Sequence, residues 1–333
     1  MTPRPLALSA GDPAGVGAEI IAKAWQALRH GGPPFVVVGD AQLLASAGGG
    51  VKVRPVLGPK EALGAFAEAL PVIDIPLLSP VVAGRPSPAY APHVIRWIET
   101  GVGLALSGAV RGLVTAPIAK APLYEAGFKF PGHTEFLAEL TAAERFEGAR
   151  GPVMMLAASD LRATLVTIHT ALAKVPGALT VEAIVNSGLV TAQALRTDFG
   201  IAQPRLAVAA LNPHAGEGGA LGREEIEIIG PAVEALRAQG VDAFGPAPAD
   251  TLFHPEARVR YDGVLCMYHD QALIPVKMLD FWGGVNITLG LPIVRTSPDH
   301  GVGFDIAGRG LARPDSLIAA IRLAAEIADR RGA

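Results

Sequence analysis

Three histidines, His169, His214 and His269, share one sequence context that favours metal chemistry. Each follows a short apolar stretch of the kind that forms a buried strand, and each precedes a loop or a helix. Since strand ends on one side of a sheet converge in space, the three imidazoles could meet. Three neutral imidazoles make a divalent-metal site that leaves positions open for a substrate. Their long-range spacing matches no short metal motif, so the plainer interpretation, three polar strand ends, stays open at this point.

The stretch 208–222 gives His214 a local setting that is typical of α/β enzymes. It reads VAALNPHAGEGGALG, an apolar strand followed by a glycine-rich loop, and a helical pattern starts at Arg223. Such enzymes place their chemistry at the carboxyl ends of strands. Asn212 and Pro213 mark a turn, and the glycines allow positive φ and close approach to a ligand. The alternative is an ordinary surface loop that contains a histidine.

Two further loops carry polar residues beside predicted helix starts. In FPGHTEFL, His133 and Thr134 come directly before a helical pattern. Thr134 is a good N-cap, whereas His133 could hold an anion together with the free N–H groups of the helix start. Lys120 ends the loop of VTAPIAK, where a solvated side chain is the simpler interpretation. The opening loop GDPAGVG lacks the dinucleotide-fingerprint spacing, and a structural turn explains it.

Composition narrows the class of protein. Half of the 333 residues are apolar and 18% are charged, which is typical of a globular chain with a large core. The net charge of −3 and the lack of any Lys/Arg run argue against nucleic-acid binding. The single cysteine, Cys266, excludes internal disulfides and fits a reducing compartment. With no signal-peptide pattern and no apolar run of ~18–20 residues, we expect a cytoplasmic protein that does not cross a membrane.

Apolar stretches and helical periodicity alternate along the chain, which indicates an α/β fold with intertwined lobes. We expect 284–310 to be mostly loop. Strands are expected at the opening of 5–25, at 35–40, ending at 113–114, within 152–170, and at 205–211, 241–246 and 262–270. Helices are expected from Ala18 and at 59–70, 92–107, 176–199, 224–239 and 314–331.

Eight motifs together resemble the 4-hydroxythreonine-4-phosphate dehydrogenase family. They occur in the family's order and cover nearly the whole chain, from about Leu6 to the C-terminal helix, so the resemblance is highly specific. The motifs are AGDPAGVG, TAPIAK, FPGHTEFL, LNPHAGEGG, PADTLF, MYHDQ, GVNITLGLP and RTSPDHGVGFDIAG. One departure is Pro131, where Thr or Ser is as readily expected, and it puts little in doubt.

The resemblance implies a fold and an assembly. The family has the fold of isocitrate and isopropylmalate dehydrogenases, with two intertwined α/β lobes, a central mixed sheet and an active-site cleft between the lobes. Residues 1–333 should therefore form a single catalytic chain of two α/β lobes that crosses between them more than once. The family is a homodimer with its active site at the subunit interface, so the expected partners are a second copy and a small phosphorylated hydroxy amino acid, with no nucleic acid and no membrane.

The resemblance also assigns binding residues. His169, His214 and His269 match the family's ligands for a divalent cation, for which Zn, Mg, Co and Mn are the candidates. The positions that match the family's substrate-binding residues are His133, Thr134, Lys277, Asn286 and Arg295.

The cofactor and the base follow from the same resemblance. The segment 300-HGVGFDIAGRG-310 is similar to the adenosine-binding loop of the decarboxylating dehydrogenases, which explains why no Rossmann fingerprint is needed. NAD or NADP is therefore expected to contact His300, Gly301 and Asp305. For the catalytic base, Lys277 and Asp250 are both candidates, and the sequence does not choose between them.

The implied reaction is oxidation of the C3 hydroxyl of 4-phosphooxy-L-threonine by NAD(P)+. The product, 2-amino-3-oxo-4-phosphooxybutanoate, then decarboxylates to 3-amino-2-oxopropyl phosphate in pyridoxal 5'-phosphate biosynthesis. A metal held by three histidines can lower the pKa of the hydroxyl and later polarise the ketone. Arg295 and Lys277 supply cationic donors for the phosphate or the carboxylate.

Two alternatives remain at this point. One is a sister dehydrogenase that acts on 4-phosphoerythronate or 4-phosphothreonate, against which LNPHAGEGG argues mildly. The other is a non-enzymatic phosphate-binding protein that keeps the fold, against which the three histidines and the lysine argue.

Overall fold

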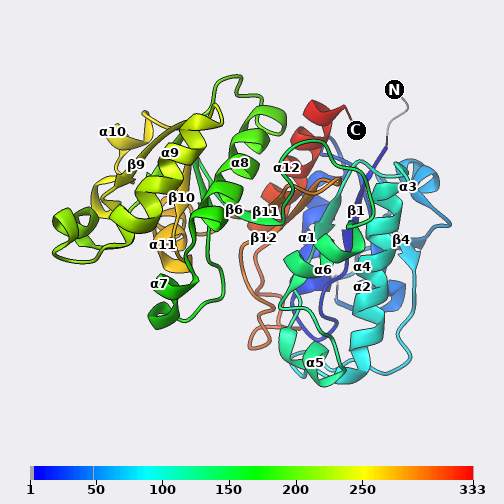
Figure 1. Cartoon of the computed structure of the whole chain (residues 1–333). Coiled ribbons are helices and arrows are strands. Elements are labelled where there is room, and N and C mark those ends of the chain that lie inside the picture. Colours follow the sequence, from blue (N-terminus) through cyan, green and yellow to red (C-terminus); the bar gives the residue numbers. More distant parts are fainter. Residues whose placement is uncertain (1–3, 48, 333) are drawn as a thin grey trace. The chain divides into compact units, whose positions relative to one another are not determined.

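The computed structural model describes residues 4–47 and 49–332, and the chain divides into two compact units. Unit 1 comprises residues 1–144 and 292–333, and unit 2 comprises residues 145–291. The chain therefore leaves unit 1 once and returns to it with its last segment. In Figure 1, unit 2 is the part of the chain coloured from green to orange.

Unit 1 is built on a parallel sheet. Its strands follow the order β3-β4-β2-β1-β5-β12, and all paired neighbours run parallel. The central strand β1 is fully buried, as expected for a parallel strand with helices on both sides. The register sets Ser9 beside Thr115 at the carboxyl ends of β1 and β5. The strands are β1 (Leu6–Ser9), β2 (Phe35–Gly39), β3 (Val53–Pro55), β4 (Leu70–Asp74), β5 (Leu113–Thr115) and β12 (Arg295–Pro298).

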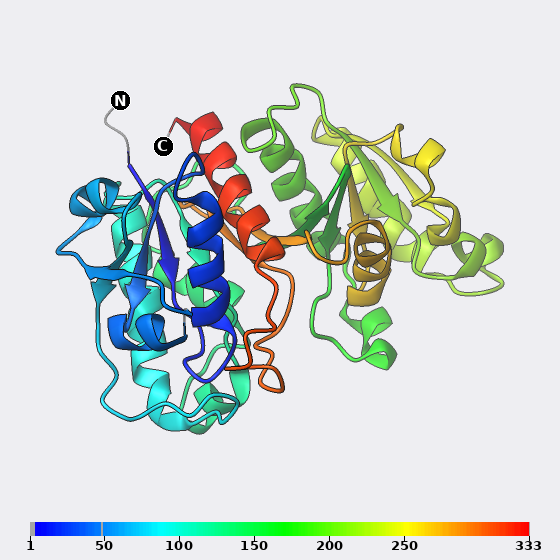
Figure 2. The same cartoon turned by 180° about the vertical axis from the view of Figure 1, so that it is seen from behind.

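Helices cover both faces of this sheet. Figure 2 shows α1 and α12 together on one face, and α4 packs on the other. Helix α4 presents Val94, Ile98 and Val102 to the core at helical spacing. The helices of unit 1 are α1 (Gly17–Leu28), α2 (Ala41–Ala47), α3 (Pro59–Ala65), η1 (Pro88–Tyr90), α4 (Ala91–Leu106), α5 (Lys120–Glu125), α6 (His133–Leu140) and α12 (Asp315–Arg331).

Unit 2 contains a mixed sheet. The order is β11-β6-β7-β10-β8-β9, in which β11, β6 and β7 pair antiparallel and the remaining pairs are parallel. The hairpin from β6 to β7 turns at Ser159, which has a positive φ of 51°. The strands are β6 (Val153–Ala158), β7 (Leu161–Leu165), β8 (Arg205–Ala209), β9 (Asp242–Ala247), β10 (Gly263–Cys266) and β11 (Val285–Leu289).

The helices of unit 2 lie on both sides of its sheet. Helices α8 and α9 pack together on one side, and α11 lies on the other (Figures 1 and 2). No single helix among the described residues is long and apolar enough to span a membrane, and Leu172–Ala178 with Val181–Thr197 meet that test only as a pair bent by 91°. The helical segments are η2 (Leu172–Lys174), α7 (Val175–Ala178), α8 (Val181–Thr197), η3 (Pro213–Gly219), η4 (Glu225–Ile229), α9 (Gly230–Ala238), η5 (Ala249–Thr251), α10 (Pro255–Arg258) and α11 (His269–Leu279).

The predicted α/β class and the mixed sheet are confirmed, and most predicted elements occur close to their expected positions. The predicted loop-rich character of 284–310 is confirmed, but the segment also contains two short strands that were not predicted, β11 and β12. Strand β12 has the sequence RTSP. It lacks the apolar residues by which a buried strand is recognised, although all four of its residues are buried. The strand expected over 262–270 stops at Cys266, and His269 instead begins α11.

Candidate active site

A buried arginine organises the polar side chains of unit 1. Arg295 opens β12 and is only 2% exposed, and its Nη2 donates a hydrogen bond to the Thr115 hydroxyl at 2.7 Å. Burial lowers the pKa of Arg295 to about 10, so the guanidinium stays charged at neutral pH. A buried guanidinium presents strong charge-assisted donors, so this arrangement suits an anionic ligand.

His133 adds a neutral hydrogen-bond donor to this group. Its pKa is lowered well below the usual 6.5 by burial, and further by the charges of Arg295 and Lys120. The His133 Nδ1 lies 3.4 Å from Nη2 of Arg295. A guanidinium can only donate, so Nδ1 accepts and the proton of the neutral ring lies on Nε2. That Nε2 is buried without a protein partner, which leaves a donor for an oxygen of a ligand.

Lys120 belongs to the same group. It begins α5, and burial lowers its pKa while the carboxylate of Glu135 raises it. A Cβ atom on Gly132 would stand 3.3 Å from both the Lys120 Nζ and the Glu135 Oε2. Gly132 has an extended φ of −176°, which any residue adopts, so a side chain here would meet only close contact with Lys120 and Glu135. The lysine therefore lies directly over the backbone that leads into His133.

Asp12 fixes the backbone that precedes this lysine. The N–H of Asp12 donates to the carbonyl of Pro117 at 2.9 Å. Its carboxylate accepts the N–H of Ala14 at 2.9 Å and the N–H of Ala119. Burial raises the pKa of Asp12, an effect that these N–H donors partly offset. The opening glycine loop and the loop before Lys120 are thus held together.

The predicted cofactor loop packs beside the opening glycine loop. The carbonyl of Val302 accepts a hydrogen bond from the N–H of Val16 at 2.9 Å. His300, Gly301 and Asp305 are all exposed, and the His300 Nδ1 lies 2.9 Å from the carbonyl of Gly301. This places the loop within reach of dissolved ligands, and its role in cofactor binding stays a prediction.

Unit 2 holds the three strands that lead to the predicted metal ligands. Strands β7, β10 and β8 are neighbours and run parallel, with Leu165 beside Cys266 and Leu265 beside Val208. The strands therefore end along one edge of the unit 2 sheet, as the sequence led us to expect. The histidines themselves come a few residues beyond these ends.

Two polar side chains tie the three strand ends together. The hydroxyl of Thr167, beyond β7, donates to the carbonyl of Met267 at 2.7 Å. Gln271 is buried and accepts the N–H of Met267 at 2.6 Å, while its Nε2 donates to the carbonyl of Ala210 at 2.7 Å. Hydrogen bonds thus connect the three backbone segments at positions that precede the histidines in sequence.

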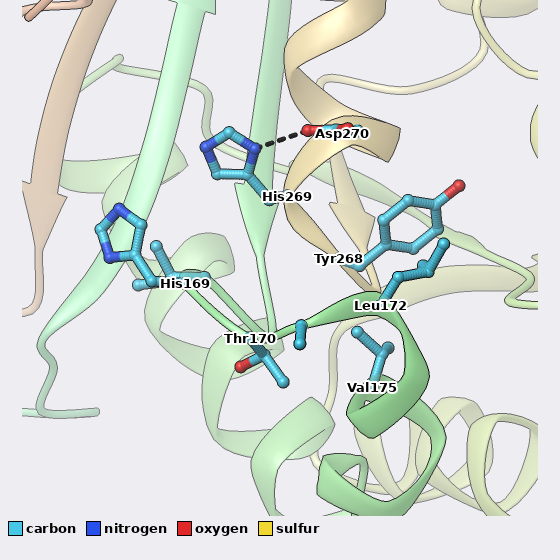
Figure 3. A pocket seen from close by; sticks show the side chains of 9 residues that line it. His169, Thr170, Leu172, Val175, Tyr268, His269 and Asp270 are labelled. Carbon is cyan, nitrogen blue, oxygen red and sulfur yellow. Dashed lines mark hydrogen bonds and ion pairs between the residues drawn. The ribbon is translucent and has the colours of Figure 1, made fainter.

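His169 and His269 line one pocket of about 360 Å³ (Figure 3). Their ring centroids are 6.1 Å apart, and the rings are tilted by 37°. The His269 Nδ1 is 2.7 Å from the carboxylate of Asp270. A carboxylate in this position orients an imidazole and leaves its other nitrogen for a ligand. Since metal–nitrogen bonds are roughly 2.0–2.1 Å long, this ring separation allows both imidazoles to bind one ion.

His214 lies in a strained turn. Five consecutive residues from His214 to Gly218 have positive φ, and three of them, His214, Ala215 and Glu217, are not glycine. Left-handed backbone costs a non-glycine residue roughly 1–2 kcal/mol. The backbone of this turn therefore winds in the opposite sense to an ordinary helix. The exposed His214 side chain is presented by backbone that the surrounding residues must hold in place.

Within residues 4–47 and 49–332 of one chain, no three His, Cys, Asp or Glu side chains are grouped closely enough to hold a metal. His214 is not among the residues that line the pocket of His169 and His269. The three-histidine site thus stays a prediction, with two of its members side by side.

The remaining predicted residues also belong to unit 2. Asp250 is exposed within η5. Lys277 lies on α11, with its Nζ 5.3 Å from the centre of the Phe281 ring. Asn286 lies on β11, and its Oδ1 is buried without a hydrogen-bond partner. Their assigned roles in binding or catalysis stay predictions.

Sequence reasoning missed three residues of these groups. The sequence places Thr115 only in a loop, predicts a solvated Lys120, and does not single out Gln271. Lys120 and Thr115 both belong to the TAPIAK motif, and Gln271 ends MYHDQ. Their position inside motifs shared with the family could have indicated these polar residues as site candidates.

Known proteins with the same name are similar to nearly the whole chain. The chain is 86% identical over 332 residues to the 4-hydroxythreonine-4-phosphate dehydrogenase of Caulobacter vibrioides, with 100% of both chains covered. It is 55% identical to the enzyme of the same name from Maricaulis maris, with 98% of each covered. The crystal structure of 4-hydroxythreonine-4-phosphate dehydrogenase from Klebsiella pneumoniae has a TM-score of 0.83 and 41% identity, covering 98% of this chain and 99% of that one.

A family model gives an independent match. The model described as pyridoxal phosphate biosynthetic protein PdxA matches residues 32–324, a range that includes the arginine group of unit 1 and the histidine pair of unit 2. The relatives extend the similarity over nearly the whole chain. The chain belongs to the PdxA family of pyridoxal phosphate biosynthetic proteins.

Proposed function

We propose that this chain is a 4-hydroxythreonine-4-phosphate dehydrogenase that oxidises 4-phosphooxy-L-threonine with NAD(P)+. The observation that carries the proposal is the buried group of unit 1, in which Arg295 and the unpartnered Nε2 of His133 present donors for an anion. A phosphate ester supplies the oxygens that these donors require. The name shared by the relatives supplies the rest of the substrate.

The residues of unit 1 would bind and orient the substrate phosphate. Arg295 stays charged at neutral pH, and its hydrogen bond to Thr115 fixes the plane of the guanidinium. His133 contributes its Nε2–H as a neutral donor, and Thr134 is buried in the first turn of α6 beside it. Free N–H groups at the start of α6 add to the attraction for an anion.

The residues of unit 2 would serve the reacting carbon. When bound, a divalent metal supplies Lewis acidity at the substrate hydroxyl, and NAD(P)+ accepts the hydride. His169 and His269 would hold the metal, and Asp270 would orient His269. Lys277 and Asp250 are the candidates to accept the hydroxyl proton. Asn286 would offer its buried, unpartnered amide oxygen to the substrate amine.

The metal site would be completed by His214 of a second copy. Three ligands from one chain are not grouped in the described residues, whereas His169 and His269 already lie together. A dimer would also cover four exposed apolar side chains on and after α11. These are Ile274 at 63% exposure, Met278 at 82%, Phe281 at 60% and Trp282 at 49%.

A substrate comparison tests the proposal. Purified protein loaded with Co²⁺, Zn²⁺, Mn²⁺ or Mg²⁺ is mixed with NAD+ or NADP+, and NAD(P)H is followed by absorbance. Turnover of 4-phosphooxy-L-threonine is expected, with little turnover of 4-phosphoerythronate or 4-phosphothreonate. Faster oxidation of either of these two phosphates would replace the proposal with the sister activity. Equal turnover of unphosphorylated 4-hydroxy-L-threonine would show that Arg295 and His133 of unit 1 do not bind the substrate phosphate.

A further inference from the structure

We propose that Glu225 is a positioning residue that holds the left-handed turn of η3 and thereby fixes where His214 leaves the sheet. The inference rests on the proposed function in one respect, the role of His214 as a metal ligand. Glu225 is 4% exposed, whereas its neighbours Ile226 and Glu227 are exposed. It begins η4, a π-helical segment, a form that often occurs at functional sites.

The Glu225 carboxylate binds the backbone directly before the turn. Its Oε1 accepts the N–H of Leu211 at 2.8 Å and the N–H of Asn212 at 2.7 Å. Its Oε2 accepts the side-chain amide of Asn212 at 2.9 Å. Three donors therefore converge on one buried carboxylate, two residues before His214. These hydrogen bonds hold the end of the strand directly before the residues with positive φ begin.

The turn closes tightly around the same carboxylate. A Cβ atom on Gly216 would lie 2.7 Å from the Glu225 Oε2, so this position leaves room only for glycine. The N–H of Leu221 donates back to the carbonyl of Gly216 at 3.1 Å, which closes the loop after the turn. Gly216 is thus held between Glu225 and the end of its own loop.

The composition of the turn shows why a clamp is required. Glycine adopts positive φ without strain, but His214, Ala215 and Glu217 carry side chains in that region. Without external bonds these residues would relax to right-handed or extended backbone, and the imidazole of His214 would move. Glu225 accepts bonds from the backbone only up to Asn212, so its effect on His214 acts through the turn rather than by contact.

The test compares Glu225→Gln with Glu227→Gln. In Glu225→Gln, one carboxylate oxygen becomes an NH2 group, which then faces either the backbone N–H groups of Leu211 and Asn212 or the side-chain amide of Asn212, donor against donor. Hydrogen exchange of residues 211–221 should accelerate at least about tenfold, and Co²⁺ affinity, read from the cobalt absorption spectrum, should fall about 10–100-fold. Glu227 is exposed and paired with Arg223, so Glu227→Gln should change neither reading. Asn212→Ala removes the side-chain bonds to the Glu225 Oε2 and to Glu224 but keeps both backbone bonds to Glu225, so it should show a smaller change in the same direction.

A rescue separates positioning from general destabilisation. Adding Ala215→Gly and Glu217→Gly to Glu225→Gln should recover part of the cobalt affinity, because glycine holds the left-handed backbone without help. Unchanged exchange and affinity in both Glu225→Gln and Asn212→Ala would overturn the inference, as would a glycine pair that rescues nothing. If wild-type protein took up no cobalt, the proposed metal site would fail, while the exchange rates would still decide whether Glu225 holds the turn.

Discussion

The polar group of unit 1 and the histidine pair of unit 2 differ in how far one chain completes them. Arg295 and Thr115 are at most 2% exposed and bonded to each other. His169 is exposed, and the side chain of His269 is 38% exposed, in an open pocket (Figure 3). One chain supplies the buried cationic group of unit 1, whereas the described residues of one chain do not group three His, Cys, Asp or Glu side chains so that they could hold a metal.

The difference follows from the chemistry that each group serves. Burial strengthens the attraction between cationic donors and a phosphate, and a single unit can supply that burial. A catalytic metal keeps one coordination position open for substrate, so its site must stay accessible from solution. We therefore expect losses in unit 2 to remove the reaction and losses in unit 1 to weaken substrate binding.

The largest expected effect is the loss of a histidine from the unit 2 pair. His269→Ala should lose bound metal and reduce turnover by more than about a hundredfold, the upper limit for disturbing only a ligand's hydrogen-bond partner. Chelation of wild-type protein should have the same effect, and added Co²⁺ should reverse it. His254→Gln is a matched control, because His254 is an exposed histidine of unit 2 that pairs with Glu256, away from the pocket. Full turnover by metal-free protein would contradict the assignment.

Removing the buried guanidinium of unit 1 should have the next largest effect. A hydrogen bond from a charged donor contributes about 1.5–3 kcal/mol, so Arg295→Met should raise the KM for the phosphorylated substrate roughly 10–100-fold. Metal content should stay unchanged, in contrast to His269→Ala. The control is Arg322→Met, which removes an exposed arginine of α12 in the same unit. A loss of metal in Arg295→Met with an unchanged KM would reverse the roles of the two groups.

The half-buried His133 should make unit 1 sensitive to acid. Its pKa is lowered in the folded chain, so the unfolded chain takes up the proton first as the pH falls below about 6.5. Stability is then lost by up to about 1.4 kcal/mol per pH unit, until the lower folded pKa is reached. His133→Gln should lose this slope between about pH 6.5 and 5, measured by urea unfolding. His30→Gln, at an exposed position, should keep it, and equal slopes in wild type and His133→Gln would contradict the half-buried neutral ring.

The smallest effect is expected at the predicted cofactor loop. A Cβ atom on Gly301 would meet nothing within 4 Å, so Gly301→Val should fold normally. The added side chain should weaken NAD+ binding severalfold, as measured by calorimetry, and leave metal content intact. Unchanged NAD+ affinity would show that the cofactor binds elsewhere.

The α/β class and most elements could be predicted from sequence because apolar periodicity determines them. Strand β8 and helix α4 are apolar patterns of this kind. The short strand β12 could not be recognised, because Arg295 and its neighbours are buried polar residues whose partners come from distant segments. The periodicity of apolar residues indicates which face of an element is buried. It does not indicate the hydrogen bond between Arg295 and Thr115, which are 180 residues apart in sequence.

The candidate site was predictable in its residue types but not in its backbone. The Gly-rich stretch around His214 indicated positive φ, yet the extension of that backbone to Ala215 and Glu217 depends on contacts such as those of Glu225. Lys120 was predicted to be solvated, whereas it is half-buried, and its side chain lies beside the distant backbone of Gly132.

The central claim is that one chain supplies the anion-binding group of unit 1, whereas two chains together supply the metal site. It is tested most directly by mixing inactive variants. If His169 and His269 act together with His214 of a second copy, a His214→Ala/His269→Ala heterodimer contains one intact metal site. It should bind one Co²⁺ per dimer and recover about half of the wild-type activity. A His169→Ala/His269→Ala heterodimer should bind none tightly, because each site lacks one of the pair. Recovery in the second mixture, or a verified first heterodimer that takes up no cobalt, would contradict the account.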